Sequence, residues 1–335
     1  MRVGVIGAGA VGGAIAALLA RGGHQVEVTA RGEHLTSIRK NGIRLTGAWG
    51  DYTAVVEAAE TLRRGPELVI VAAKAQDAVA AIRGNARFLG GIPILIVQNG
   101  LDGVSNAQAA APQSDVVGAL AMFASSFLSP GTITITTAGH TYLGGGNGEH
   151  DVPTRYVAGI LAEVMPVSVV QNFVGAQWTK LVVNQINALP AISGLSAQDV
   201  IGNGALRRIM TASIRENVRV GLRSGIRFET LHGLSHRRLQ LFSLLPLWIG
   251  QCVPLLMKAR MGRTPNPGST LQSIRRGQST EIDYLNGAVV RAAKGVGWAA
   301  PVNAALVQLV HEVEKSGKFL GPDEIVRRVS HPPVE

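Results

Sequence analysis

The chain has 335 residues, 46% of them hydrophobic and only 16% charged, which is enough apolar material for one large or two medium-sized domains. Its net charge of +10 suits an anionic small molecule, whereas scattered basic pairs and 4% aromatic residues do not suit a nucleic-acid-binding surface. A single cysteine, Cys252, excludes an intrachain disulfide and a multi-cysteine metal site. We therefore expect a cytoplasmic protein that acts on small molecules.

The first residues have the pattern of a dinucleotide-binding fold. An apolar strand, residues 3–6, leads into the sequence Gly7-Ala8-Gly9-Ala10-Val11-Gly12, and a helix is predicted over residues 10–21. In such a motif the first glycine permits a tight turn, the second lets a pyrophosphate approach the backbone, and the third lets the helix pack on the strand. The amides at the helix N-terminus then face the phosphates. We expect residues 7–12 to bind a dinucleotide.

The end of the second predicted strand, residues 24–30, indicates which dinucleotide is bound. NAD-binding domains usually carry an Asp or Glu there, which bonds the ribose 2′-hydroxyl, but this strand runs into Thr29-Ala30-Arg31. A guanidinium can bond a 2′-phosphate through two parallel N–H groups. The sequence thus favours NADP(H), with a solvent-facing Arg31 as the alternative.

Strands and helices alternate up to about residue 174, which is typical of a doubly wound Rossmann-type α/β sheet. Two near-continuous apolar runs, residues 67–72 and 92–97, predict parallel strands that are buried on both faces. Further strands are predicted at residues 43–46, 51–57, 116–121, 132–137, 140–143 and 167–171, with a helix near 153–165.

Two polar residues follow the buried strands, at the sheet edge where ligands bind in this class of fold. Lys74 follows the first apolar run and is a candidate contact for a cofactor phosphate or a substrate carboxylate. Asn99 follows the second run and has two interpretations. Its amide bonds the nicotinamide or a substrate oxygen, or Asn99-Gly100 is simply a turn.

The pattern changes at about Gly175, where strand signals end and helical periodicity takes over. The clearest helices are predicted at residues 205–223 and 301–315, the second with a proline at its first position. The predicted architecture is therefore an α/β domain, residues 1–174, followed by an all-α domain, residues 175–335.

A cluster of polar residues lies on one of the predicted helices. Lys180, Asn184 and Asn187 are spaced to share one face of an otherwise apolar helix. Pro190 should kink or end that helix shortly after Asn187. A lysine in such a site could protonate a carbonyl oxygen, with a pKa lowered by burial and by neighbouring cations. A polar stripe that bonds to another helix is the alternative, and the residues alone leave both open.

A second cluster lies between residues 269 and 287. Ser269 could offer a hydroxyl to a substrate carboxylate. Ser279 or Thr280 is placed to cap a helix whose first turn carries Glu281 and Asp283, where carboxylates suit the helix dipole. The alternative is that Glu281 and Asp283 only stabilise the helix and have no role in binding or catalysis.

The segment of residues 239–257 contains no charged residue and is long enough to span a bilayer. Pro246 and Pro254 interrupt it, so we expect no membrane span but helices that are buried or face a partner. The partner could be a second copy of this chain, which would make the protein a homodimer. His232 and His236 have no third ligand nearby in the sequence, so no metal site is predicted.

Taken together, these residues resemble the ketopantoate reductase family. The matching features are GAGAVGG at residues 7–13, Arg31, Lys74, QNG at 98–100, SPG at 129–131, WxKLxxN at 178–184, Ser269 and RxGxxTEIDYLNG at 275–287. They extend over nearly the whole chain. The lysine-asparagine helix followed by TEIDYLNG is much more specific than the glycine-rich loop.

The resemblance implies a Rossmann domain joined to a helical domain of the 6-phosphogluconate dehydrogenase-like kind, with the active site in the cleft between them. It implies metal-free, NADPH-dependent reduction of 2-dehydropantoate to pantoate, on the route to pantothenate and coenzyme A. Lys180 would be the general acid, and Glu281 would bind the substrate and orient the site. The implied substrate contacts are Asn99, Asn184, Asn187 and Ser269, and the implied NADP contacts are residues 7–12, Arg31, Lys74 and Asn99.

The chain departs from the compact members of the family in two places. Residues 230–268 are long and apolar, as in a longer branch, and could line a pocket for a larger 2-oxo acid. No histidine is present between Phe123 and Thr137, where related chains often have one. Both departures bear on which 2-oxo acid is reduced. A nucleotide-binding protein without turnover is the alternative from a different class.

Overall fold

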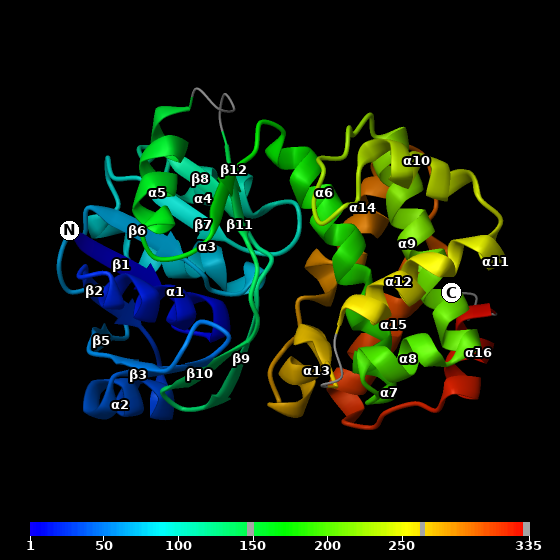
Figure 1. The fold of residues 1–335 in the computed structure, drawn as a ribbon, viewed down its shortest axis with the longest axis horizontal. Helices are drawn as coiled ribbons and strands as arrows, with labels where there is room; N and C mark the ends of the chain where they lie inside the picture. The colour runs from blue at the N-terminus through cyan, green and yellow to red at the C-terminus, as the bar shows by residue number, and fades with distance from the viewer. Residues whose placement is uncertain (146–150, 262–264, 331–335) are drawn as a thin grey trace. The chain divides into compact units, whose positions relative to one another are not determined.

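The computed structural model describes residues 1–145, 151–261 and 265–330 (Figure 1). The chain forms two compact units, Met1–Phe173 and Val174–Glu335. Every strand of the described residues lies in the first unit, and the second unit is helical. The predicted fold class, a Rossmann-type α/β domain followed by an all-α domain, is confirmed.

The first unit is built on an eight-stranded sheet with the order β12-β11-β8-β7-β6-β1-β2-β5. Neighbouring strands are parallel, except that β11 is antiparallel to β8. The strands are β1 (Arg2–Ile6), β2 (Gln25–Thr29), β5 (Glu57–Ala59), β6 (Leu68–Val71), β7 (Ile94–Val97), β8 (Val116–Ala121), β11 (Thr141–Gly144) and β12 (Val167–Val169). Because β1 pairs with β2 on one side and with β6 on the other, its carboxyl end is the switch point where such folds bind ligands.

Helices cover both faces of this sheet, since its central strands are apolar on both sides. They are α1 (Ala10–Arg21), α2 (Gly32–Asn41), α3 (Ala75–Gly84), α4 (Gly103–Ala110) and α5 (Val152–Ala162), with a 3-10 turn η1 (Ala86–Phe88). Strand β6 shows the alternation. Leu68 and Ile70 belong to the apolar cluster that includes α1 and α5, whereas Val69 and Val71 belong to the cluster that includes α3 and α4.

A second, four-stranded sheet lies against α1 and has the order β4-β3-β10-β9. Its strands are β3 (Ile43–Gly47), β4 (Tyr52–Ala54), β9 (Ala124–Ser129) and β10 (Thr132–Thr137). Gly13 of α1 faces this sheet so closely that a Cβ atom there would lie 2.1 Å from Cδ1 of Ile133. Helix α1 is therefore packed between the two sheets.

In this region one strand prediction is wrong and one strand is not predicted. The single strand predicted over residues 51–57 is two strands in different sheets, β4 and β5. The chain leaves one sheet and enters the other at Val55, whose side chain is 89% exposed. The sequence does not predict β9, because its residues lack an apolar alternation. This strand forms by antiparallel pairing with β10 across the Ser129-Pro130-Gly131 turn.

The second unit is built around the long helix α9 (Gly204–Arg223), which begins where Asn203 Oδ1 accepts the N–H groups of Ala205 and Leu206, both at 3.1 Å. Helices α8, α10, α11, α12, α14, α15 and α16 pack against it. The other elements are α6 (Phe173–Asn184), η3 (Gln185–Asn187), α7 (Ala188–Ser193), α8 (Ala197–Gly202), α10 (His236–Leu244), α11 (Leu247–Gly250), α12 (Cys252–Arg260), α13 (Gly268–Arg275), η4 (Ile282–Tyr284), α14 (Asn286–Gly295), α15 (Pro301–Ser316) and α16 (Pro322–Ser330).

The uncharged segment of residues 239–257 runs through three short helices, α10, α11 and α12. Pro246 directly precedes α11, and Pro254 lies in the first turn of α12, where a helix tolerates proline. Among the described residues, no helix is long and apolar enough to cross a membrane. Five large apolar side chains of this segment are nevertheless exposed. They are Leu241, Leu244, Trp248, Leu255 and Leu256.

Candidate active site

The glycine-rich loop has the geometry that a dinucleotide requires. Gly7 has a φ of +97°, and a Cβ atom there would lie 2.7 Å from the backbone nitrogen of Ala73. A Cβ atom on Gly12 would lie 2.1 Å from the carbonyl oxygen of Gly7, so α1 approaches β1 too closely for any side chain. At Gly9, a Cβ atom would meet no other part of the described chain within 4 Å. The backbone at Gly9 is therefore open to a ligand.

Two side chains outside the motif hold this loop. Thr29, buried at the end of β2, accepts the N–H of Gly7 at 3.0 Å. The ring of His34 accepts the N–H of Gly131 through Nδ1 at 3.0 Å, so Nε2 carries the proton and donates to the carbonyl oxygen of Ala8 at 2.6 Å. Burial lowers the pKa of His34, which favours this neutral ring. Sequence reasoning misses both residues, because their partners lie far away along the chain.

The carboxyl end of β2 presents a guanidinium and not a carboxylate. Arg31 is exposed and directly precedes α2. The acid of this strand, Glu27, is buried and accepts the backbone N–H groups of Arg63 at 2.8 Å and Arg64 at 3.4 Å. Glu27 therefore fixes the loop after β5, which leaves Arg31 as the charged group at the strand end.

Lys74 and Asn99 follow β6 and β7, on the same sheet edge as the glycine-rich loop. Lys74 occupies the N-cap position of α3, and both residues are partly buried. The side chain of Gln98 donates through Nε2 to the carbonyl oxygen of Ala73 at 2.8 Å, which ties the two strand ends together. The structure thus places Lys74 and Asn99 beside the switch point of the sheet.

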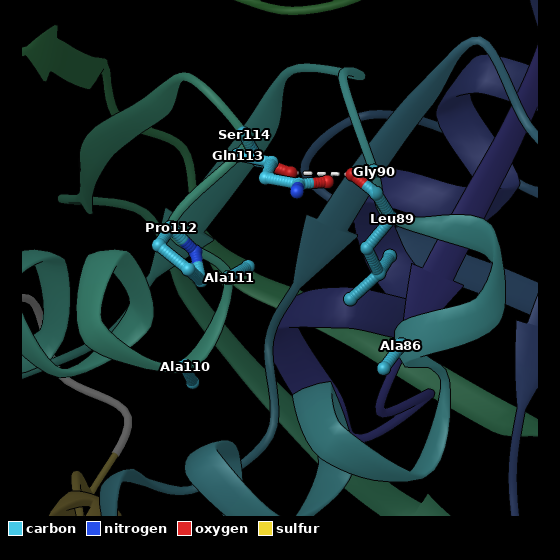
Figure 2. Close-up of a pocket in the computed structure, with 8 residues that line it drawn as sticks. All are labelled: Ala86, Leu89, Gly90, Ala110, Ala111, Pro112, Gln113 and Ser114. Carbon is cyan, nitrogen blue, oxygen red and sulfur yellow. Dashed lines mark hydrogen bonds between the residues drawn. The ribbon is translucent and has the colours of Figure 1, made fainter.

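A pocket in the first unit lies at the opposite edge of the sheet (Figure 2). Its lining residues are Ala86, Leu89, Gly90, Ala110, Ala111, Pro112, Gln113 and Ser114. They precede β7 and β8, and the hydroxyl of Ser114 donates to the carbonyl oxygen of Leu89. These strands run parallel to β1, whose carboxyl end carries the glycine-rich loop. The pocket is therefore separate from the candidate dinucleotide site.

In the second unit the central residue is Lys180 on α6, whose side chain is buried. Burial lowers the pKa of Lys180 to about 8, while the negative charge of Glu281 opposes part of this shift. The prediction that neighbouring cations contribute is not supported, since burial is the cause of the lowering. Near neutral pH the ammonium group keeps its proton but can release it far more readily than a surface lysine can.

The helix that carries Lys180 ends earlier than predicted. Helix α6 ends at Asn184, a 3-10 turn follows, and α7 begins at Ala188. Pro190 lies within the first turn of α7, where its missing N–H has no intrahelical acceptor. Asn187 is therefore not on the same α-helix as Lys180 and Asn184, and the expected shared face ends at Asn184.

Asn187 instead packs against the start of α13. A Cβ atom on Gly268, whose φ is +71°, would lie 2.5 Å from Oδ1 of Asn187. Ser269 is the next residue and is exposed, whereas Asn184 and Asn187 are partly buried. The structure thus brings Asn187 to the residue that precedes Ser269, at one end of α13.

Glu281 lies before the 3-10 turn η4, and α14 begins only at Asn286. The prediction that Glu281 lies in the first turn of an α-helix is wrong, because Leu285, with φ −103° and ψ −94°, interrupts the helical backbone. Thr280 accepts the N–H of Ile282 through Oγ1 at 3.2 Å, so it caps the 3-10 turn and not an α-helix.

Helix α15 braces the chain on both sides of Glu281. Glu314 accepts the backbone N–H of Thr280 at 2.6 Å. His311 bonds Asp283 through Nε2 at 3.0 Å and Glu314 through Nδ1 at 2.8 Å. Burial alone would lower the pKa of His311, but the two carboxylates outweigh it and the pKa is raised.

No group of three or more His, Cys, Asp or Glu side chains within the described ranges could hold a metal ion. His236, one of the two histidines considered above, accepts the N–H of Phe228 through Nδ1 at 3.2 Å. This bond gives His236 a structural role in the loop before α10.

A glycine-rich dinucleotide loop in one unit and a buried lysine of lowered pKa in the other are the features of a nicotinamide-dependent reductase. Two family models agree with this class. One, described as ketopantoate reductase PanE/ApbA, matches residues 3–148, and the other, described as the C-terminal part of that family, matches residues 172–314. The chain belongs to the ketopantoate reductase family, so the resemblance seen in the sequence is confirmed.

Individual relatives match over nearly the full chain. The 2-dehydropantoate 2-reductase of Pyrococcus abyssi is 26% identical over 313 residues, which cover 92% of this chain and 97% of that protein. The crystal structure of a PanE/ApbA family ketopantoate reductase from Ralstonia eutropha is 27% identical, with a TM-score of 0.79 and coverage of 94% and 99%. D-mandelate dehydrogenase, solved with NADH and anilino(oxo)acetate, is 19% identical with the same TM-score of 0.79 and the same coverage of 94% and 99%. At that identity the likeness shows the fold alone.

Proposed function

We propose that this protein reduces 2-dehydropantoate to pantoate with NADPH. Membership of the ketopantoate reductase family and the names of the curated relatives support the substrate. The observation in this chain that carries the proposal is Lys180, a buried lysine with a pKa of about 8 that interacts with the charge of Glu281. Such a lysine can deliver a proton near neutral pH, which reduction of a carbonyl group requires.

The first unit, residues 1–174 in this proposal, would hold the cofactor. The open backbone at Gly9 and the close approach of Gly7 and Gly12 fit a pyrophosphate over residues 7–12. The exposed guanidinium of Arg31 fits a 2′-phosphate and favours NADP(H). Lys74 and Asn99, at neighbouring strand ends, would complete the contacts. When bound, NADPH supplies the hydride.

The second unit, residues 175–335, would supply the acid. The carbonyl carbon of the 2-oxo acid gains the hydride, and its oxygen takes a proton from Nζ of Lys180, which yields the 2-hydroxy acid. The buried site then tolerates the neutral amine, since burial is what disfavours the charged form. Glu281 would stabilise the ammonium group before the transfer and help to bind the substrate.

Four further residues are proposed to hold the substrate. Asn184 lies one helical turn from Lys180 on α6, and Asn187 adjoins the start of α13, where Ser269 is exposed. Amide and hydroxyl groups of this kind can donate hydrogen bonds to a carboxylate or a carbonyl oxygen without adding charge. Asn99 in the first unit would contact both the substrate and the nicotinamide.

The deciding experiment measures NADPH oxidation by absorbance, with 2-dehydropantoate beside a panel of bulkier 2-oxo acids and with NADH as the control. We expect turnover of 2-dehydropantoate with NADPH and little with NADH. Turnover of another acid alone would keep the reaction and change the substrate. Tight NADPH binding without turnover of any acid would contradict the enzymatic proposal.

We also propose that the protein is a cytoplasmic homodimer with a small 2-oxo acid as substrate. The exposed apolar side chains on α10, α11 and α12 support an assembly, because isolated domains seldom expose several large apolar residues on one segment. Their exposure also argues against the idea that this segment lines a pocket for a larger acid. Sedimentation of the purified protein would measure the assembly directly.

A further inference from the structure

A group of buried polar side chains lies in the core of the second unit. We call it the amide cluster. Its members are Gln185 of η3, Ser213 of α9, Asn286 of α14 and Asn303 of α15, and each is 0% exposed. These four side chains bond to one another, while Nε2 of Gln185 and Oδ1 of Asn286 have no hydrogen-bond partner within the described residues. The amide cluster thus joins four separate elements.

The carboxylate of Glu216 sets the direction of every bond in the amide cluster. It accepts the backbone N–H groups of Val302 and Asn303, both at 2.9 Å, and also Nδ2 of Asn303 at 2.7 Å. Burial raises the pKa of Glu216 although these bonds oppose the shift. Because an ionised carboxylate only accepts, Asn303 must turn its NH2 group to Glu216 and its oxygen inward.

The remaining bonds follow from that orientation. Nδ2 of Asn286 donates to Oδ1 of Asn303 at 2.9 Å and to Oε1 of Gln185 at 2.8 Å. The hydroxyl of Ser213 donates to the same oxygen of Gln185 at 2.6 Å. The side chain of Gln185 is therefore held in one orientation by two donors, and Asn286 is the donor that connects Gln185 to α14.

The amide cluster connects the two segments that carry the proposed proton-transfer groups. Gln185 directly follows Asn184, at the point where the helix of Lys180 gives way to a 3-10 turn. Asn286 begins α14, at the end of the short segment that carries Glu281. The hydrogen bond between Asn286 and Gln185 therefore joins the segment that carries Glu281 to the segment that carries Lys180.

Hydrogen bonds hold elements at a defined distance and angle, whereas apolar contacts tolerate sliding and repacking. An apolar core of the same shape would be about as stable, so polar clusters of this kind act mainly on geometry. We propose that Asn286 and Gln185 are positioning residues that fix Glu281 relative to Lys180. This inference rests on the function proposed above.

The proposal has a readout that does not depend on turnover. Among the causes of the shifted pKa of Lys180, the charge of Glu281 is the one that raises it. If Glu281 moves away, the pKa of Lys180 falls below about 8. Competitive acylation with acetic anhydride over a range of pH, followed by mass spectrometry, reports this titration in the free protein.

The main variant is Asn286→Leu, which keeps the number and branching of the side-chain heavy atoms and removes the donor. Asn217→Leu is the matched control, since Asn217 is also 0% exposed and lies on α9, and its amide bonds to no residue that the structure describes. We expect Asn286→Leu to lower the apparent pKa of Lys180 and to reduce kcat about 10- to 100-fold, with NADPH affinity unchanged. Asn217→Leu should leave the pKa of Lys180, kcat and the NADPH affinity unchanged. Normal titration of Lys180 and normal kcat in Asn286→Leu would overturn the proposal.

The double variant Gln185→Leu with Asn286→Leu separates positioning from folding. Removing one partner leaves the other buried without a hydrogen bond, which lowers the stability, whereas removing both restores much of it. We expect the double variant to unfold at a higher temperature than Asn286→Leu while its kcat remains low and its Lys180 titration remains shifted. Recovery of kcat together with stability would show a structural role only and would overturn the proposal.

The two proposals can fail separately. A wild-type protein that reduces no 2-oxo acid, but whose Lys180 titration shifts in Asn286→Leu and not in Asn217→Leu, would refute the proposed reaction and support the positioning role. A wild-type protein that reduces 2-dehydropantoate, with no shift in any variant, would support the reaction and refute the positioning role.

Discussion

At the scale of single residues, burial turns Lys180 from a permanent cation into a usable acid. A solvated lysine has a pKa near 10.4 and would hold its proton through a reaction at neutral pH. Burial brings the pKa of Lys180 to about 8, and Glu281 keeps it from falling further. The proposed acid is thus set by two opposing effects, and each can be altered by one substitution.

The pH dependence of turnover tests this balance. Because Lys180 must carry its proton, kcat should be constant below about pH 8 and fall as the pH rises through that value. Lys180→Ala should reduce kcat by about two to four orders of magnitude and remove the alkaline limb. Lys315→Ala, at an exposed position of α15, is the control and should change neither. A near-normal rate in Lys180→Ala would rule out the assigned role.

A second residue, Arg31, is expected to decide which cofactor is used. Arg31→Ala should weaken NADPH binding by about 10- to 100-fold and leave NADH binding nearly unchanged, since only NADPH carries the 2′-phosphate. Titration of the protein fluorescence with each cofactor measures the two dissociation constants. Arg83→Ala, exposed at the end of α3, should affect neither cofactor. Equal losses for the two cofactors would contradict the assignment.

At the scale of elements, the loop and helix that open the chain use their glycines for different purposes. Gly12→Ala should prevent folding of the first unit or lower its unfolding temperature strongly, because the new Cβ would meet the carbonyl oxygen of Gly7 at 2.1 Å. Gly9→Ala should keep the wild-type unfolding temperature, because its Cβ meets no other part of the described chain. It should bind NADPH weakly, because the same Cβ would occupy the space proposed for the pyrophosphate. Thermal unfolding and NADPH titration together distinguish the two, and normal NADPH binding by Gly9→Ala would contradict the proposed site.

The brace between α15 and the Glu281 segment should make stability depend on pH. The pKa of His311 is raised, so its contribution is complete below the unfolded value near 6.5 and is lost as the pH rises through the folded value. Since His311 is partly exposed, the effect should stay within about 1 kcal/mol. His311→Gln should flatten the decline of the unfolding temperature as the pH rises above about 6.5. An unchanged slope would show that the brace contributes nothing.

The elements also show what a sequence can reveal. Helix α1 and strands β6 and β7 follow directly from local pattern, because their side chains meet one continuous apolar environment. Strand β9 lacks an apolar alternation and forms by pairing with β10. The 3-10 turn that ends α6 carries Gln185, whose partners Ser213 and Asn286 lie far away along the chain, so local pattern does not contain it. The candidate site divides in the same way. Residues 7–12 form a local motif, whereas His34 and the amide cluster become visible only after folding.

At the scale of the whole molecule, the exposed apolar segment is the feature that a monomer does not explain. The double variant Leu244→Lys with Trp248→Lys should be monomeric if the proposed homodimer uses this surface, because two charges cannot be buried without partners. Sedimentation velocity would measure the change. Val55→Lys, at an equally exposed apolar position in the first unit, is the control and should leave the assembly intact. A double variant that stays dimeric would place the interface elsewhere.

The packing of α1 between two sheets has a consequence for the order of events during synthesis. Gly13 of α1 is covered by Ile133 of β10, and β10 pairs with β3, so residues far apart in the chain meet at this helix. Contacts between such distant residues form slowly. A nascent chain that has emerged only as far as residue 131 already contains the complete glycine-rich loop but lacks the strand that holds α1 in place. We therefore expect a nascent chain of this length to bind the cofactor weakly until β10 has emerged from the ribosome.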